Sequence, residues 1–270
     1  MVHLLVVSAS IWAAFVPLGL LAQDAQDSQN TLSTEDRYIT LSAAGDRRGL
    51  VDLWREDPEA VVPVIDRDLE GSLALWEEEG GAKRAEIDAL IARATAAASA
   101  AVEATGRRRV LDYVTSFAGW TAEQKGSFRS GQRACRAGTE ALREGNSDVA
   151  LAKGGECRAL AEPLGDWWGT AMGLRLEGSA LSETKEGERA ATAFSRARLI
   201  FRELGLTSSA LRIEADLAEI LLELGRRPRA EAIIRDGRSS ATRLNLPELE
   251  RRFQELEEQL SNGSTVRRSR

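Results

Sequence analysis

The sequence predicts an all-α fold, and three observations support this. Ala, Leu, Glu and Arg dominate the composition, and all four are strong helix formers. Proline is scarce, with six among 270 residues. The chain also has no clear run of alternating β-branched residues, the pattern typical of strands. With 29% charged and 43% hydrophobic residues, the composition is that of an ordinary globular protein.

The first 22 residues are typical of a secretory signal peptide. Met1 to Ala22 is apolar and contains no Lys, Arg, Asp or Glu. Pro17 and Gly19 favour a cleaved signal over a retained membrane anchor, which is the alternative because a span needs about 20 apolar residues. We therefore expect a bacterial chain that is exported and is periplasmic or secreted. Membrane contact is expected only if the segment stays uncleaved.

After a polar lead-in (23–34) that we expect to be flexible, residues 35–120 predict an irregular N-terminal helical region. The apolar spacing predicts one helix from Tyr38 to the break at Asp57-Pro58, and a second that ends at Gly80-Gly81. An Ala-rich helix (82–105) and a short apolar helix (110–120) follow. Residues 23–105 carry 18 acidic and 8 basic residues, whereas residues 106–270 carry 24 and 28. No stripe is basic enough to predict a nucleic-acid partner.

The second half of the chain is an internal repeat with a period of about 40 residues, a length typical of helical-repeat units. Small residues recur at three positions of each unit, and large side chains there would push neighbouring helices apart. The three sets are Gly138, Ala150 and Cys157; Gly178, Ala190 and Ala197; and Ala218, Ala230 and Gly237.

This spacing resembles the tetratricopeptide repeat (TPR), in which a small residue on one helix is followed at the same two offsets by small residues on the next. The bulky site of that family falls on Phe194 and Ile234, but on Gly154 in the first unit. The family's aromatic signature is mostly missing, and its usual period is shorter. The resemblance implies a TPR-like superhelix of antiparallel helix hairpins over residues 121–260. A capping helix begins at Pro247, and we expect a disordered tail (261–270).

Histidine is absent after the signal segment, because the one histidine of the chain is His3. This excludes Ser-His-Asp and Cys-His catalysis and His-ligated zinc from the exported chain. No cofactor or metal motif is present, so we expect a protein that is not an enzyme. A carboxylate-based glycan-active enzyme stays a weaker alternative; its candidate acids are Glu77, Glu78, Glu79, Glu183, Glu186 and Glu188.

Cys135 and Cys157 lie at equal distances along the chain before and after a predicted turn at Asn146. In an antiparallel hairpin they therefore lie at the same height, and an oxidising compartment would permit a disulfide. Equal height does not ensure that the two thiols face each other. Two buried free thiols remain the alternative.

The sequence offers two sets of partner-binding candidates. Trp167 and Trp168 open a predicted helix and form either an aromatic platform or packing between hairpins. Arg189, Arg196 and Arg229 belong to Arg-rich helices that either grip an acidic peptide or pair with neighbouring Glu. We expect a scaffold that mediates protein–protein interaction with a protein or peptide partner. The alternative is a sensory or regulatory module that binds a peptide or small ligand.

Overall fold

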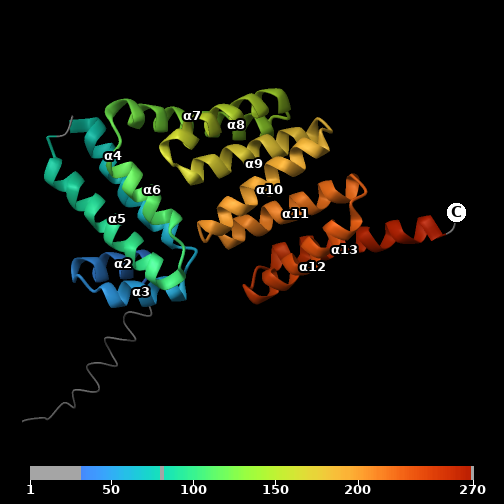
Figure 1. Ribbon diagram of the computed structural model, residues 1–270, viewed down its shortest axis with the longest axis horizontal. Coiled ribbons are helices and arrows are strands. Elements are labelled where there is room, and N and C mark those ends of the chain that lie inside the picture. The colour runs from blue at the N-terminus through green and yellow to red at the C-terminus, as the bar shows by residue number, and fades with distance from the viewer. Residues whose placement is uncertain (1–31, 80–81, 269–270) are drawn as a thin grey trace, which may run out of the picture.

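The computed structural model describes residues 32–79 and 82–268, and these form an all-α stack of twelve α-helices without strands (Figure 1). The predicted signal peptide and most of the predicted lead-in lie outside the described residues. Among the described helices, none combines the length and apolarity needed to cross a membrane. The helices are α2 (Thr34–Ala43), α3 (Arg47–Glu56), α4 (Val61–Glu79), α5 (Arg84–Thr105), α6 (Arg109–Ala118), α7 (Ala122–Arg143), α8 (Ser147–Ala161), α9 (Trp167–Glu183), α10 (Gly187–Glu203), α11 (Thr207–Glu223), α12 (Arg227–Arg243) and α13 (Pro247–Arg268).

The helices α7 to α13 pack sequentially in antiparallel pairs, as a repeat-like stack. The second helices of the three pairs begin at Ser147, Gly187 and Arg227, each one sequence period after the last. The helices α9, α11 and α13 begin at Trp167, Thr207 and Pro247, which are spaced in the same way. The sequence period is therefore also the period of the structure.

The small residues of the repeat lie inside the stack, where neighbouring helices touch. Ala150, Ala190 and Ala230 are fully buried. Gly178 faces the ring of Phe194, and a Cβ atom there would lie 2.7 Å from it. Gly237 faces the ring of Phe253 of α13 in the same way. Such close approach leaves no room for larger side chains.

The N-terminal helices differ from the prediction at one turn. The single helix predicted from Tyr38 to the Asp57-Pro58 break is two helices, α2 and α3, separated at Ala44-Gly45. Gly45 has a φ of +65°, which ends α2, and Asp46 caps α3 by accepting a hydrogen bond from the Gly49 N–H at 2.9 Å. The apolar spacing continues across this turn, so periodicity alone does not reveal it.

The end of the chain differs as well. The predicted disordered tail is helical as far as Arg268, because α13 continues past the expected end at Leu260. The hydroxyl of Ser261 donates to the carbonyl of Glu257, a contact within the continuing helix. Once a helix is nucleated, each added residue gains a backbone hydrogen bond at little cost.

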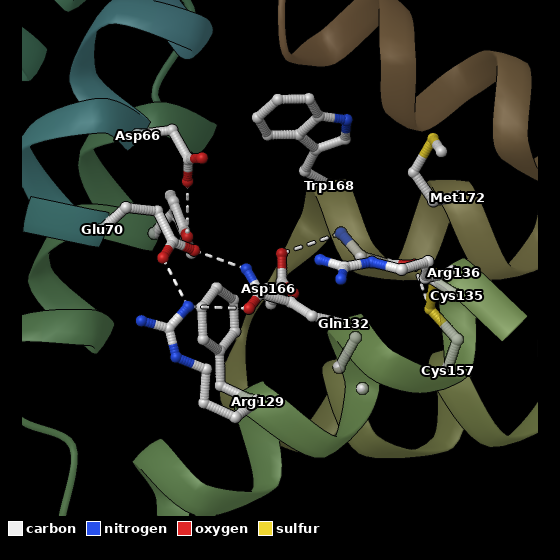
Figure 2. A pocket seen from close by; sticks show the side chains of 15 residues that line it. Asp66, Glu70, Arg129, Gln132, Cys135, Arg136, Cys157, Asp166, Trp168 and Met172 are labelled. Atoms are coloured by element: carbon white, nitrogen blue, oxygen red, sulfur yellow. Dashed lines mark hydrogen bonds and ion pairs between the residues drawn. A yellow bond between two sulfur atoms is a disulfide. The ribbon is translucent and has the colours of Figure 1, made fainter. Parts of the chain in front are cut away.

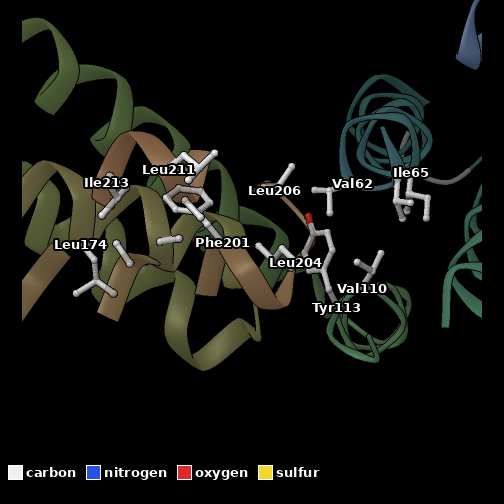
Figure 3. Packing of buried hydrophobic residues seen from close by; sticks show 14 of the residues in the cluster. Val62, Ile65, Val110, Tyr113, Leu174, Phe201, Leu204, Leu206, Leu211 and Ile213 are labelled. Carbon is white, nitrogen blue, oxygen red and sulfur yellow. The ribbon is translucent and has the colours of Figure 1, made fainter. Parts of the chain in front are cut away.

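The N-terminal region and the repeats share one hydrophobic core. The turn between α10 and α11 lies against α4 and α6, so that Leu204 and Leu206 approach Val62 and Tyr113 (Figure 3). Close by, the backbone N–H of Ser208 donates to Glu59, at 2.7 Å across 149 residues of sequence. This contact holds the N-terminal helices against the middle of the stack.

Candidate functional site

A cavity of about 430 Å³ lies where the N-terminal helices meet the first repeat helices (Figure 2). Its walls come from α4, α6, α7, α8 and the start of α9. The lining residues are Asp66, Glu70, Tyr113, Phe128, Arg129, Gly131, Gln132, Cys135, Arg136, Cys157, Ala161, Asp166, Trp168, Gly169 and Met172. The volume falls within the range of small-ligand pockets.

Asp66 forms the α4 side of the cavity, within the apolar run that packs α4 on the core. Its carboxylate accepts a hydrogen bond from the Tyr113 hydroxyl at 3.1 Å. Burial raises the pKa of Asp66 to about 7, and the negative charge of Glu70 adds to this effect. The hydrogen bond from Tyr113 opposes the shift in this pKa. Asp66 therefore changes its charge near neutral pH.

Asp166 lies across the cavity and caps α9. The chain turns at Gly165, whose φ is +68°, and the Asp166 carboxylate then accepts a hydrogen bond from the Gly169 N–H at 2.8 Å. Only 6% of this residue is exposed. Burial raises the pKa of Asp166 to about 6, against the lowering effect of the helix N–H groups.

The third carboxylate, that of Glu70, is neutralised by a network on α7. Arg129 donates to Glu70 at 2.5 Å and to Glu77 at 2.8 Å. Gln132 accepts from Arg129 at 2.8 Å and donates to Glu70. The hydrogen bond from Arg129 lowers the pKa of Glu77, and the same pairing raises that of Arg129. This network fixes one wall of the cavity.

The remaining wall is apolar and is held by a disulfide. Cys135 of α7 and Cys157 of α8 are bonded, with their Cα atoms 5.2 Å apart. Disulfides are typical of oxidising, extracytoplasmic compartments. Trp168 and Met172 of α9 extend along the opposite side (Figure 2). The cavity thus combines an aromatic and thioether surface with buried carboxylates.

The two adjacent tryptophans have different surroundings. Trp167 packs under Arg109 of α6, whose guanidinium carbon lies 4.1 Å from the ring centroid. Arg109 also pairs with Glu203 of α10 at 2.5 Å, which ties α6, α9 and α10 together. Trp168 lines the cavity. One ring therefore packs between elements, while the other faces open space.

The three candidate arginines lie away from this cavity. Arg189 pairs with Glu186, the residue directly before its own helix, and Arg196 pairs with Glu162 at 3.2 Å. Both line a second hollow of about 360 Å³ over α9 and α10. Arg229 is exposed on α12. The structure does not bring the three together with the tryptophans.

Sequence reasoning misses the carboxylates of the cavity, Asp66, Glu70 and Asp166. Asp66 and Asp166 lie far apart along the chain, so no local motif joins them. Each nevertheless carries a local signal. Asp66 interrupts the apolar run that begins at Val61, and Asp166 stands at a helix cap directly before two tryptophans. The acids singled out from the sequence lie outside the cavity lining.

No protein-family model matches the chain, and no curated protein matches it either. Within the described residues, no group of three or more His, Cys, Asp or Glu side chains is arranged to hold a metal ion.

Proposed function

We propose that the chain is an exported helical-repeat scaffold that holds a segment of another protein. The repeat stack supports this function, because stacked helix pairs offer an extended surface on which a polypeptide can lie. The stack continues through α10, α11, α12 and α13 beyond the cavity. The TPR-like spacing of the small residues agrees with this proposal, although fold alone does not determine function.

The observation that carries the proposal is the cavity between the N-terminal helices and α7 to α9. It presents charged, aromatic and thioether groups from separate elements to one bound group. A partner whose side chain enters this cavity would gain specificity there and contact area along the stack. The disulfide in its wall supports an extracytoplasmic location for this binding.

Site-specific photocrosslinking in the cells that make the chain tests this proposal. A photoreactive amino acid at Met172 lines the cavity, and the same group at Thr192 lines the hollow over α9 and α10. Exposed Glu231 on α12 is the control position. We expect one discrete protein adduct from Met172 and no such adduct from Glu231. Equal adducts from all three positions, or none from any, would contradict the proposal.

The same cavity favours a second function, a sensory or regulatory module that binds a peptide or small ligand. Its volume of about 430 Å³ suits a small molecule without any contribution from the rest of the stack. Native mass spectrometry of the chain purified from its host separates the two functions. A retained small molecule without a protein adduct favours the sensory module.

A further inference from the structure

We propose that the cavity between the N-terminal helices and α7 to α9 binds an ammonium group carried on an apolar stem. This group belongs to a lysine side chain or to a free alkylamine. This inference deepens the proposed function, because it names the chemical group that the cavity recognises. The choice of a lysine side chain as the source of that group rests on the proposed function. Four features of the lining carry it.

The first feature is a pair of carboxylates without a cationic partner. Asp66 accepts from the neutral Tyr113 hydroxyl, and Asp166 accepts from a backbone N–H. In the described part of the chain, neither forms an ion pair with Lys or Arg. A carboxylate as buried as that of Asp166 is usually paired, because burying an isolated charge is costly. A bound ammonium would supply the missing positive charge.

The second feature is that Arg129, the cation that faces Asp66, is already engaged. Arg129 divides its guanidinium between Glu70 and Glu77. Arg136 also lines the cavity, and its guanidinium extends from α7 toward Asp166 (Figure 2), although no ion pair joins these two side chains. Asp66 and Asp166 therefore remain without an ion-pair partner among the described residues.

The third feature is the apolar surface beside the carboxylates. The ring of Trp168 and the thioether of Met172 both extend along the cavity (Figure 2). An alkyl stem packs against such groups, and an ammonium near an aromatic face gains further attraction. A small hydrated cation would leave this surface unused.

The fourth feature is the direction of titration. Asp66 is faced by Glu70 on its own helix, by Tyr113 from α6, by Arg129 from α7 and by Asp166 before α9. Burial raises the pKa of both aspartates, to about 7 and about 6. A cation favours their charged forms, so its binding releases protons below neutral pH. The affinity for the amine then rises as the pH rises from 5.5 to 7.5.

Calorimetric titration of the purified chain with Nα-acetyl-lysine amide tests the inference. Nα-acetyl-norleucine amide, which keeps the apolar stem and lacks the ammonium group, is the matched ligand. We expect saturable binding of the lysine compound, quenching or enhancement of Trp168 fluorescence that is lost in Trp168→Phe, and no binding of the norleucine compound. The affinity should rise about a hundredfold from pH 5.5 to 7.5, since both carboxylates must lose their protons.

Charge-removing variants locate the site. Asp66→Asn keeps an acceptor for Tyr113, and Asp166→Asn keeps a good helix cap, so neither variant should unfold the chain. Each should weaken binding by about tenfold or more, the usual effect of losing a charge-assisted hydrogen bond. Asp46→Asn is the matched control, because Asp46 caps α3 outside the cavity lining. It should bind the amine like the wild type.

Three results would overturn the inference: equal affinity for the lysine and norleucine compounds, no binding of either, or undiminished binding in both aspartate variants. Loss of binding in Arg136→Ala would overturn it too, because removing a nearby positive charge should strengthen or preserve the binding of a cation.

A lysine-containing heptapeptide distinguishes the two sources. Binding about tenfold tighter than that of Nα-acetyl-lysine amide assigns the ammonium to a polypeptide, whereas equal binding assigns it to a free amine. Amine binding without a crosslinked protein would contradict the scaffold function and leave the amine site standing. A crosslinked protein without amine binding would contradict the amine site and leave the scaffold function standing.

Discussion

Lys185 and Gly225 occupy the same turn position in successive repeat units, and both have left-handed backbone, with φ of +64° and +71°. Each follows the first helix of a repeat pair, and the backbone N–H of the next residue bonds back to the helix in both. The same geometry occurs at Gly145, one period earlier, with φ of +74°. Lysine therefore stands in one unit where the other two have glycine.

We predict that Lys185→Gly stabilises the protein by about 1 kcal/mol, because a residue with a Cβ atom is strained in this conformation. Urea denaturation of the two proteins would measure the difference. The reciprocal variant Gly225→Lys should lose a similar amount of stability. No atom lies within 4 Å of a Cβ atom placed at Gly225, so backbone strain is the only effect that this substitution measures. Unchanged stability in both variants would contradict the assignment of strain.

A second prediction concerns Gly173, where α8 and α9 approach closely. A Cβ atom at Gly173 would lie 2.8 Å from the Gly154 carbonyl oxygen and from the Arg158 nitrogen. Both are backbone atoms, so the helices themselves would have to separate. We expect Gly173→Ala to cost about 2–3 kcal/mol in thermal or urea unfolding.

Gly126 is the matched control for this substitution. It lies within α7, and nothing lies within 4 Å of a Cβ atom placed on it. Gly126→Ala should therefore stabilise the chain by about 0.5–1 kcal/mol, the usual preference of a helix for alanine. If the two substitutions changed stability equally, the close approach of α8 and α9 would be wrong.

The repeat stack could be predicted because its signal is local and periodic. A small residue is required wherever two helices touch, so Ala150, Ala190 and Ala230 mark three equivalent contacts. The turn at Gly45 escapes prediction because the apolar pattern runs through it. The docking of Leu204 and Leu206 on α4 and α6 is a tertiary event between distant segments, and no short motif encodes it.

The cavity is unpredictable from the sequence for the same reason. Asp66 and Asp166 line one cavity only because the α10–α11 turn and the α7–α9 helices hold the N-terminal region in place. The cysteine spacing predicts the equal height of Cys135 and Cys157, but not the direction of either side chain. Trp168 stands out by its residue type, whereas its partners in the cavity do not.

The third prediction concerns the disulfide between Cys135 and Cys157, two residues that lie 22 positions apart in the sequence. Constraining a loop of this length in the unfolded chain contributes about 3 kcal/mol. We expect the double variant Cys135→Ser, Cys157→Ser to lose about this amount in urea denaturation. Adding dithiothreitol should lower the stability of the wild type toward that of the variant and leave the variant unchanged. A wild type that is insensitive to the reductant would contradict the prediction.

The last prediction concerns the pH dependence of stability that Asp66 confers. Its pKa rises from 3.8 to about 7 on folding, chiefly through burial. Between these values the folded state binds more protons than the unfolded state, so this group stabilises the fold at low pH. The contribution is complete below about pH 4 and is lost as the pH rises through about 7.

Asp66→Asn removes this dependence, because asparagine does not ionise. From pH 5 to pH 8, the free energy of unfolding of the variant should therefore rise by about 2 kcal/mol relative to that of the wild type. A fully buried carboxyl would give a larger change, but the cavity leaves Asp66 half-buried. Urea denaturation at pH 5, 6, 7 and 8 measures this difference, and the many other titrating groups cancel in the comparison. Asp46→Asn, on the surface, should show no such trend. A difference that stayed constant, or that favoured the wild type at pH 8, would mean that Asp66 is charged throughout this range and that burial does not control it.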